Sequence, residues 1–415
     1  MSPVTMLVIG AGSRGTGYSG FASEHPDRAK VVGVAEPRDF YRDRLAKAHS
    51  IPKANVFTDW REAAGRERFA DAALICTQDA MHAEPAVALA QRGYHVLLEK
   101  PMAPNEADCR RIVAAAKAAG VIFAVCHVMR YTAYTRRLKA LLAEGLVGDI
   151  VSIQHLEPVG YWHQAHSFVR GNWRNEAESA CMLLAKSCHD LDWLRHVMGA
   201  RFRRVSSFGS LQHFRKEGAP AGAGQRCLDC GVEAQCPYSA KKIYLGRVER
   251  SQTGWPANVL TPVVTKESVA EALRTGPYGR CVYACDNDVV DHQVVNMEFE
   301  GGQTAVFTMT AFNKGGGRVT RIFGTRGEIH TNSSTIEHFD FLTDKSQTID
   351  TRAADAGILG GHGGGDYGLM DSFIAAVAEN NPARILSGPD EALETHLAVF
   401  AAERSRREGR VVNVV

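Results

Sequence analysis

The sequence carries no excess of charge of either sign and no long apolar run. Its 48 lysine and arginine residues balance 46 aspartate and glutamate residues, which leaves a formal charge of +2. A general nucleic-acid binder needs a basic face that displaces the counterions of the phosphate backbone, so we expect no nucleic-acid partner. No apolar run reaches the roughly 18 residues that a membrane-spanning helix needs, so we expect no membrane partner either.

Other absences narrow the class of protein further. Low-complexity tracts and internal repeats are missing, and the mix of 45% hydrophobic and 23% charged residues excludes disorder as the main state. The start of the chain has no basic segment followed by a long apolar one, so we expect no signal peptide and a cytoplasmic location. The 415 residues are enough for two domains with a large core.

The first 130 residues alternate short apolar strands with helical stretches. Strands are expected at Thr5–Ile9, Val31–Ala35, Ala72–Cys76, His95–Glu99 and Ile122–Cys126. Between the last two, Asn105 can cap a helix that has Asp108 at its third position and Gly120 just past its end. This alternation predicts an α/β fold with a parallel sheet that helices cover on both faces.

After about residue 150 the pattern becomes that of a mainly antiparallel sheet. Alternating runs are found at Ile150–Leu156, Arg204–Phe214, Val289–Phe299, Thr304–Phe312 and Val319–Gly324. Helices are expected at 178–198, Asp366–Ala378 and Pro389–Arg407, and a loop at 157–175. We therefore predict that this half is mainly an antiparallel sheet, interrupted by a cysteine-rich insertion at about 210–285 and followed by helices.

A dinucleotide-binding motif follows the first expected strand. The run Gly10-Ala11-Gly12-Ser13-Arg14-Gly15 has the G-x-G-x-x-G spacing, which lets the backbone approach a pyrophosphate at a helix N-terminus. Glu36 ends the second strand, where a carboxylate can accept hydrogen bonds from both hydroxyls of an adenosine ribose, which favours NAD. Arg38 lies close enough in sequence to receive a 2′-phosphate, so NADP remains an alternative.

Five of the ten cysteines are grouped in the expected insertion: Cys227, Cys230, Cys236, Cys281 and Cys285. Three thiolates from the first segment and one from the second would form a closed tetrahedral zinc site with a structural role. The spacing does not choose between Cys281 and Cys285. An iron–sulfur cluster and uncoordinated thiols are the alternatives.

Further motifs resemble the glucose–fructose oxidoreductase / inositol dehydrogenase / MocA (Gfo/Idh/MocA) family of NAD(P)-dependent enzymes. The residues that carry the resemblance are Ile75–Asp79 with His82, His95–Pro101, His127–Tyr131, Gly145–Ile150, Gly324–Glu328 and Ala401–Val412. Only about 210–285 lies outside it. The resemblance implies an N-terminal Rossmann domain over residues 1–130 with a doubly wound parallel sheet. It also implies an α+β domain over residues 131–415, whose large open, mainly antiparallel sheet binds a sugar or cyclitol. The outer face of this second sheet is then expected to form a homodimer or homotetramer.

The resemblance also assigns residues to the cofactor site. Lys100, in the Glu-Lys-Pro signature, matches the family's lysine, whose ammonium can hydrogen-bond the reacting hydroxyl and stabilise an alkoxide. The candidate cofactor-binding residues are Gly10, Gly12, Ser13, Arg14, Gly15, Glu36, Arg38, Thr77, Gln78, His82, Glu99 and Lys100.

The family's catalytic histidine matches His189, with one departure from the family pattern. The aspartate of the usual Asp-x-x-x-His is replaced by Ala185, and Lys186 comes next. Lys186 and His189 are three residues apart and share one helix face, so both are catalytic candidates beside Lys100. A carboxylate that orients the histidine must then come from elsewhere, such as Asp190 or Asp192.

Residues 155–174 and a later glycine run are expected to bind the substrate. Aromatic faces stack on the C–H surfaces of sugars, and arginines bind carboxylate, phosphate or sulfonate groups through paired donors. Glycines in 360–365 would permit a close backbone approach to a ligand, or a mobile lid. The candidate substrate-binding residues are Arg130, Tyr131, Tyr161, Trp162, His163, His166, Arg170, Trp173, Arg174, His189 and His362.

Two reactions fit these residues. In the first, hydride passes between NAD and a ring hydroxyl of a sugar, as in a dehydrogenase. In the second, an NAD-dependent glycosidase oxidises C3 transiently, eliminates the leaving group and adds water. The missing aspartate and the extra histidines favour the second, and the arginines would suit an anionic glycoside such as a sulfoquinovoside. A regulator that only senses NAD is disfavoured because Lys100 and His189 are both present.

Overall fold

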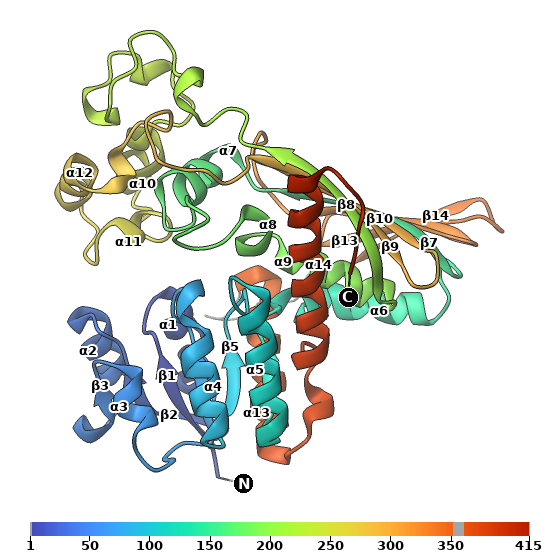
Figure 1. Ribbon diagram of the computed structural model, residues 1–415, viewed down its shortest axis with the longest axis horizontal. Helices are drawn as coiled ribbons and strands as arrows, with labels where there is room; N and C mark the ends of the chain where they lie inside the picture. The colour runs from blue at the N-terminus through green and yellow to red at the C-terminus, as the bar shows by residue number, and fades with distance from the viewer. Residues whose placement is uncertain (1, 352–360, 415) are drawn as a thin grey trace.

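The computed structural model describes residues 2–351 and 361–414 and consists of two sheets with their helices (Figure 1). Among these residues no helix combines the length and the apolar character that crossing a membrane requires. The strands of the first sheet are β1 (Val4–Ile9), β2 (Ala29–Ala35), β3 (Val56–Phe57), β4 (Ala72–Ile75), β5 (His95–Leu98) and β6 (Phe123–Val125). They are all parallel and lie in the order β3-β2-β1-β4-β5-β6, which confirms the predicted Rossmann sheet.

Helices cover both faces of this sheet, because each face is a continuous apolar surface. They are α1 (Ser13–Glu24), α2 (Asp39–Ala48), α3 (Trp60–Ala64), α4 (Ala83–Gln91) and α5 (Glu106–Ala119). The predicted cap of α5 is confirmed: the Asn105 side chain accepts from the backbone N–H of Asp108 at 2.9 Å, and Gly120 follows the helix with a φ of 62°.

The second sheet has nine strands and is mostly antiparallel. They are β7 (Ile150–Pro158), β8 (Phe202–Ser210), β9 (His292–Phe299), β10 (Thr304–Thr310), β11 (Val319–Gly324), β12 (Gly327–Thr331), β13 (Thr335–Asp340), β14 (Lys345–Asp350) and β15 (Val412–Asn413). Their order is β14-β13-β12-β11-β7-β10-β9-β8-β15, and only β7 and β10 pair in parallel. The strands β12–β14 were not expected. For β14 the reason is that its residues are exposed on both faces and leave no apolar alternation to detect.

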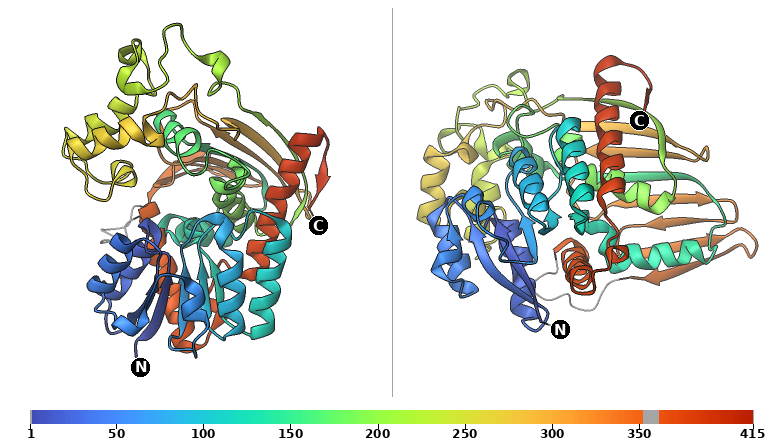
Figure 2. Two further views of the ribbon diagram at one scale, coloured as in Figure 1. Left: turned by 60° about the vertical axis from the view of Figure 1, so that its left-hand side comes forward. Right: turned by 60° about the horizontal axis from the view of Figure 1, so that its bottom comes forward.

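Only one face of this sheet is covered. The helices α6 (Ala133–Ala143), α9 (Cys188–Met198) and α14 (Pro389–Glu408) contribute residues to the hydrophobic core that forms against it. On the opposite face, Phe208 of β8 and Val306 of β10 remain exposed. The two sheets and the bare side of the second one can be followed in Figure 2.

Two expected segments have a different secondary structure. The predicted loop at 157–175 contains α7 (Tyr161–His163) and a π-helical segment, η4 (Gln164–Arg170). The predicted helix at 178–198 is broken into α8 (Met182–Ala185) and α9, with Lys186 and Ser187 between them. This break matters for the site, because Lys186 lies outside α9 and does not follow the direction of that helix.

The insertion forms a small unit with its own core. Its helices are α10 (Gly246–Val248), α11 (Ala257–Leu260) and α12 (Lys266–Thr275), and residues such as Phe214, Tyr244 and Leu273 pack together with Val169 of η4. Figure 1 shows this unit beside α7, beyond the end of the second sheet. The insertion is therefore attached to the predicted substrate-binding loop.

The last helices of the chain return to the first sheet. The helix α13 (Gly361–Glu379) packs against α1 and the η3 turn (Val128–Tyr131), and α14 packs against α5. A Cβ atom at Gly365 would lie 2.4 Å from the carbonyl oxygen of Val128. At this glycine the close approach is to the chain itself and not to a ligand. Gly360 and the side chain of His362 lie outside the described residues.

The predicted boundary between the two domains at residue 130 stays a prediction.

Candidate active site

The turn between β1 and α1 has the shape that a dinucleotide pyrophosphate needs. Gly10 has a φ of 89°, and a Cβ there would lie 2.6 Å from the carbonyl oxygen of Cys76. A Cβ at Gly15 would lie 2.0 Å from the carbonyl oxygen of Gly10. The helix begins at Ser13 with no side-chain cap and no acidic residue in its first turn, so its positive end faces any ligand placed there. These residues fit a dinucleotide.

Glu36 lies at the end of β2 in the position expected for a ribose contact. It accepts hydrogen bonds from the backbone N–H of Ala11 at 2.9 Å and from the Arg38 guanidinium at 2.7 and 2.9 Å. Burial acts to raise the pKa of Glu36, but the hydrogen bonds from Arg38 and Ala11 outweigh it and hold the pKa below its usual value. The carboxylate is therefore ionised and fixed at this edge of the sheet.

Lys100 is carried by a segment that two histidines hold in place. His82, which is buried, donates from Nδ1 to the carbonyl oxygen of Pro101 at 2.7 Å. His396 of α14 donates from Nδ1 to Ala392 and accepts at Nε2 from the backbone N–H of Met102 at 2.8 Å. Burial lowers the pKa of His396 to about 3, so it is neutral. The histidine pair fixes the backbone from which Lys100 projects.

The residue before the lysine is also fixed. The buried carboxylate of Glu99 accepts from Arg14 at 2.5 Å, from the hydroxyl of Tyr18 at 2.9 Å and from the backbone N–H of Lys100 at 2.8 Å. Arg14 reaches Asp366 of α13 as well. Thr77 and Gln78 follow β4 beside this network. Arg14 and Glu99 thus link the dinucleotide turn to the catalytic segment.

The break between α8 and α9 brings a second lysine and a histidine to the same place. The ammonium of Lys100 donates to the carbonyl oxygen of Ala185 at 2.8 Å, and Ala185 is the residue that replaces the family's aspartate. Lys186 is next in the chain, and its ammonium lies 3.1 Å from Oε1 of Glu157 on β7. His189, only 6% exposed, follows in the first turn of α9.

Two carboxylates and an arginine support this group from the second sheet. Arg318 lies just before β11, and its guanidinium contacts Oε2 of Glu157 at 3.0 Å and also binds Asp190. Burial acts to raise the pKa of Asp190, but Arg318 and His155 outweigh it and hold the pKa well below its usual range. The Asp190 carboxylate therefore binds Arg318 and His155.

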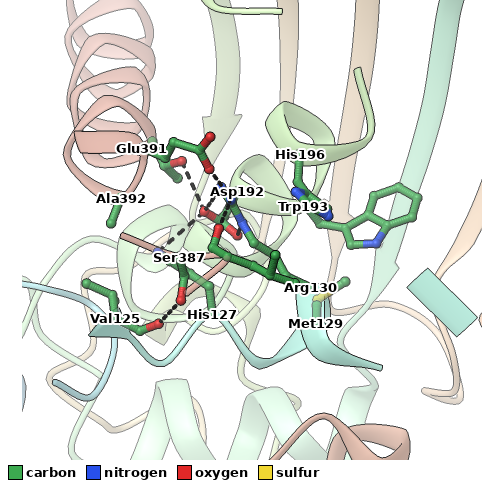
Figure 3. Close-up of polar contacts among 12 residues, drawn as sticks. Val125, His127, Met129, Arg130, Asp192, Trp193, His196, Ser387, Glu391 and Ala392 are labelled. Carbon is green, nitrogen blue, oxygen red and sulfur yellow. Dashed lines mark hydrogen bonds and ion pairs between the residues drawn. The ribbon is translucent and has the colours of Figure 1, made fainter. Parts of the chain in front are cut away.

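Asp192, the other carboxylate considered for His189, belongs to a buried ion-pair cluster that Figure 3 shows. Both of its oxygens accept from the Arg130 guanidinium, at 2.7 and 2.8 Å. Arg130 also binds Glu391 and the carbonyl oxygen of Leu386, and it has no exposed surface. We predicted Arg130 as a substrate ligand, but the structure gives its donors to these internal partners.

His127 lies between this cluster and the catalytic residues. Its Nε2 is 3.6 Å from Oδ1 of Asp192, and its ring is 5.9 Å from that of His189, measured between centroids. Burial lowers the pKa of His127 well below its ordinary value, and the nearby cations Arg130 and Lys100 lower it further. The imidazole is therefore neutral.

The other predicted substrate-binding residues divide into two groups. Five have partners within the protein. Tyr131 binds Ser387, His166 binds Tyr244, Arg170 donates to the carbonyl oxygens of Tyr238 and Arg280, Trp173 donates to Asp79, and Arg174 pairs with Asp286. Tyr161, Trp162 and His163 remain at α7. Burial lowers the pKa of His163 well below its usual value, and Lys186 and Lys100 lower it further.

The grouped cysteines do not form the predicted zinc site. Cys227, Cys230, Cys236 and Cys281 line one small cavity beside Arg170. Yet across residues 2–351 and 361–414 no three histidine, cysteine, aspartate or glutamate side chains form a group that could hold a metal ion. Burial raises the pKa of the Cys236 and Cys281 thiols. The zinc and iron–sulfur expectations are not supported.

Sequence reasoning missed two residues of the site. Glu157 could have been found, because it occupies an inward-facing position of β7, where a carboxylate needs a cationic partner. Arg318 follows three glycines and precedes a strand, and nothing local in the sequence indicates its partners. Both were left out of the candidate list.

Comparison with known proteins extends over nearly the whole chain. Residues 4–127 match the model of an oxidoreductase family described as an NAD-binding Rossmann fold, and residues 139–414 match that family's C-terminal alpha/beta domain. The protein YteT of Bacillus subtilis (strain 168) is 25% identical over 338 residues, which are 77% of this chain and 76% of YteT.

Two further likenesses concern sugar-related proteins. The 2,7-anhydro-N-acetylneuraminate hydratase of Escherichia coli (strain K12) is 28% identical over 207 residues, which are 50% of this chain and 53% of the hydratase. A levoglucosan dehydrogenase solved with NADH and levoglucosan has a TM-score of 0.71 at 19% identity, with both chains fully covered. At that identity, the likeness concerns the fold alone.

Proposed function

Because the chain belongs to the Gfo/Idh/MocA family of oxidoreductases, we propose that it is an NAD-dependent enzyme that oxidises a ring hydroxyl of a sugar or glycoside. The observation that carries the proposal is the position of Lys100. It follows β5 at the carboxyl edge of the first sheet, and its ammonium binds the carbonyl oxygen of Ala185, four residues before His189. In sheets of this kind, ligands bind outside the carboxyl ends of the strands.

The chemistry follows from the two side chains. NAD, when bound, supplies the hydride acceptor. The Lys100 ammonium can donate a hydrogen bond to the reacting hydroxyl oxygen and stabilise the negative charge that grows there. The His189 imidazole can take the hydroxyl proton, since a histidine changes its protonation state near neutral pH. Lys186, held by Glu157, offers a second cationic donor to the substrate.

A second reaction is favoured by the relative that is a 2,7-anhydro-N-acetylneuraminate hydratase. In it, oxidation at C3 acidifies the C2–H bond, a base removes that proton, and the leaving group departs from C1. Water then adds at C1, and reduction of C3 restores the alcohol, so there is no net redox change. Lys186 and Arg318 would suit an anionic substrate such as a uronide or a sulfoquinovoside, since both are partly exposed cations.

One assay separates the two reactions. The protein is incubated with NAD and nitrophenyl glycosides of neutral sugars, uronates and sulfoquinovose, and with the free sugars, while nitrophenol and NADH are both followed. NADH in stoichiometric amounts without nitrophenol release identifies the dehydrogenase. Nitrophenol release without matching NADH identifies the glycosidase. Activity of either kind that persists at the wild-type level in Lys100→Met would contradict both proposals.

We also propose that NAD is preferred over NADP, on the position of Glu36. The ionised carboxylate would repel a 2′-phosphate, and it occupies the Arg38 guanidinium that could otherwise bind one. Glu36→Ser should therefore shift the ratio of kcat/KM for NAD against NADP toward NADP by about tenfold or more. The exposed Asp39→Asn is the control and should leave the ratio unchanged. An unchanged ratio in Glu36→Ser would refute this assignment.

The last proposal concerns how copies of the chain assemble. The outer face of the second sheet is bare and carries exposed Phe208 and Val306, and patches of this kind mark protein interfaces. We expect a homodimer or homotetramer that forms through this face. Light scattering of the wild type and of Phe208→Lys should show a larger species for the wild type alone.

A further inference from the structure

The insertion places one tryptophan where its own core does not cover it. Most aromatic residues of this unit are buried, among them Phe214, Tyr238, Tyr244 and Tyr283. Trp255, in the turn before α11, is 45% exposed. A large side chain left half uncovered next to a well-packed core contributes little to that core, so its exposed part calls for another explanation.

The ring contacts of Trp255 are with the segment that follows β7. Its ring centroid lies 5.2 Å from that of Trp162, 5.0 Å from that of His163 and 5.2 Å from that of His166. All three partners belong to α7 and η4, the segment that follows β7. The insertion thus meets the candidate active site through this side chain.

His163 joins the tryptophan to the strand that holds Lys186. Burial lowers the pKa of His163 well below its usual value, and Lys186 lowers it further, so the imidazole beside the indole is neutral. The helix α7, which contains His163, follows β7 directly, and Glu157 near the end of β7 contacts the ammonium of Lys186 at 3.1 Å. Trp255 therefore lies against the segment that continues from the candidate active site.

The neighbouring exposed surface is aromatic too. Tyr161, at the start of α7, is 39% exposed, and its ring is 6.3 Å from that of Tyr238 in the insertion. Arg247 stacks over the Trp162 ring at 4.5 Å. A flat, uncharged group of a ligand gains from contact with such rings, since aromatic stacking adds to the burial of apolar surface.

We propose that Trp255 is a specificity-determining residue that stacks on the group attached to the reacting sugar, namely an aglycone or second sugar with a flat apolar face. This proposal rests on the proposed function, since it places the reacting ring at Lys100 and His189. It gives the insertion a role in choosing substrates: the insertion carries the side chain that recognises what lies beyond the reacting ring.

The test compares pairs of substrates that differ only in this group. Phenyl and methyl glycosides of glucose and of glucuronate are used with NAD, together with any sugar that the nitrophenyl panel identifies. Trp255→Ala should raise KM for the phenyl glycoside by about tenfold and change KM for the methyl glycoside by less than about twofold, with kcat on the methyl glycoside retained. Trp255→Phe should restore most of the loss, because it keeps an aromatic face.

The control is Phe341→Ala, which removes an equally exposed aromatic side chain (53%) from the turn between β13 and β14. It should change neither KM. Equal changes for both glycosides, or none for either, in a Trp255→Ala protein that keeps its thermal midpoint and NAD binding, would overturn the proposal. If Trp255→Ala does not fold, the same comparison of the two KM values is made with Trp255→Phe, and equal changes or no change would again overturn the proposal.

Calorimetric titration separates this proposal from the proposed function. Phenyl and methyl glycosides are titrated into the wild type and Trp255→Phe and Trp255→Ala in the presence of NAD. If the wild type binds the phenyl compound more tightly than the methyl compound, and this difference disappears in Trp255→Ala, the stacking role is supported. This conclusion holds even if no glycoside is turned over, because the lack of turnover would count against the proposed function alone. Equal affinities of the wild type for both compounds would overturn the stacking role.

Discussion

Replacement of Lys100 by methionine should lower kcat by about a thousandfold, because it removes a charged donor from the oxygen on which negative charge develops. Methionine keeps the length and apolar character of the lysine stem, and the Lys100 ammonium donates to the carbonyl oxygen of Ala185 at 2.8 Å. The backbone around it is held by His82 and His396, which the substitution does not touch. We therefore expect the thermal midpoint and the affinity for NAD to stay close to those of the wild type.

The measurement is single-turnover and steady-state kinetics on the substrate found in the glycoside panel, with NAD binding followed by fluorescence. Lys117→Met is the matched control, since this lysine lies on the surface of α5 and pairs with Asp390. It should keep full activity. If Lys100→Met keeps more than about a tenth of the wild-type kcat, another residue stabilises the negative charge on the reacting oxygen.

Arg130→Met should destabilise the protein by about 3–5 kcal/mol, because it leaves the carboxylate of Asp192 buried without its cation. Asp192 has no exposed surface, and both of its oxygens accept from Arg130. Glu391, the second partner of Arg130, is 47% exposed and can return to water. The loss should therefore come mainly from Asp192.

Urea unfolding of a small set of variants checks this account. Arg130→Met combined with Asp192→Leu should recover a large part of the loss, since no charge then remains buried. The exposed pair of Arg274 and Glu271 supplies the control, and Arg274→Met should change the free energy of unfolding by less than about 1 kcal/mol. If the double variant is as unstable as Arg130→Met alone, the unpaired carboxylate is not the cause.

The sequence allowed the first sheet to be predicted well because its strands are buried on both faces and read as apolar runs, as in Ala72–Ile75. The motifs at the strand ends then placed Gly10, Glu36 and Lys100, since parallel strands bring their carboxyl ends to one edge. These parts of the site depend on local pattern alone.

The remaining parts depend on partners that are distant in the sequence. Arg130 looks like a substrate ligand in the chain, and only the structure brings Asp192 and Glu391 to it, 62 and 261 residues away. The break after α8 is equally hidden, because the ammonium of Lys186 is held by Glu157, which lies on a separate strand. Long-range charge pairing of this kind leaves no periodicity to detect.

The contact between His396 and Met102 has a consequence for how the protein folds. The two residues are 294 positions apart, and the hydrogen bond between them holds the segment of Lys100. During synthesis, the Rossmann strands leave the ribosome long before α14 does, so this hydrogen bond closes only after strands β7 to β14 of the second sheet have been made. We infer that Lys100 reaches its final position late in folding, after a large loop-closure entropy has been overcome.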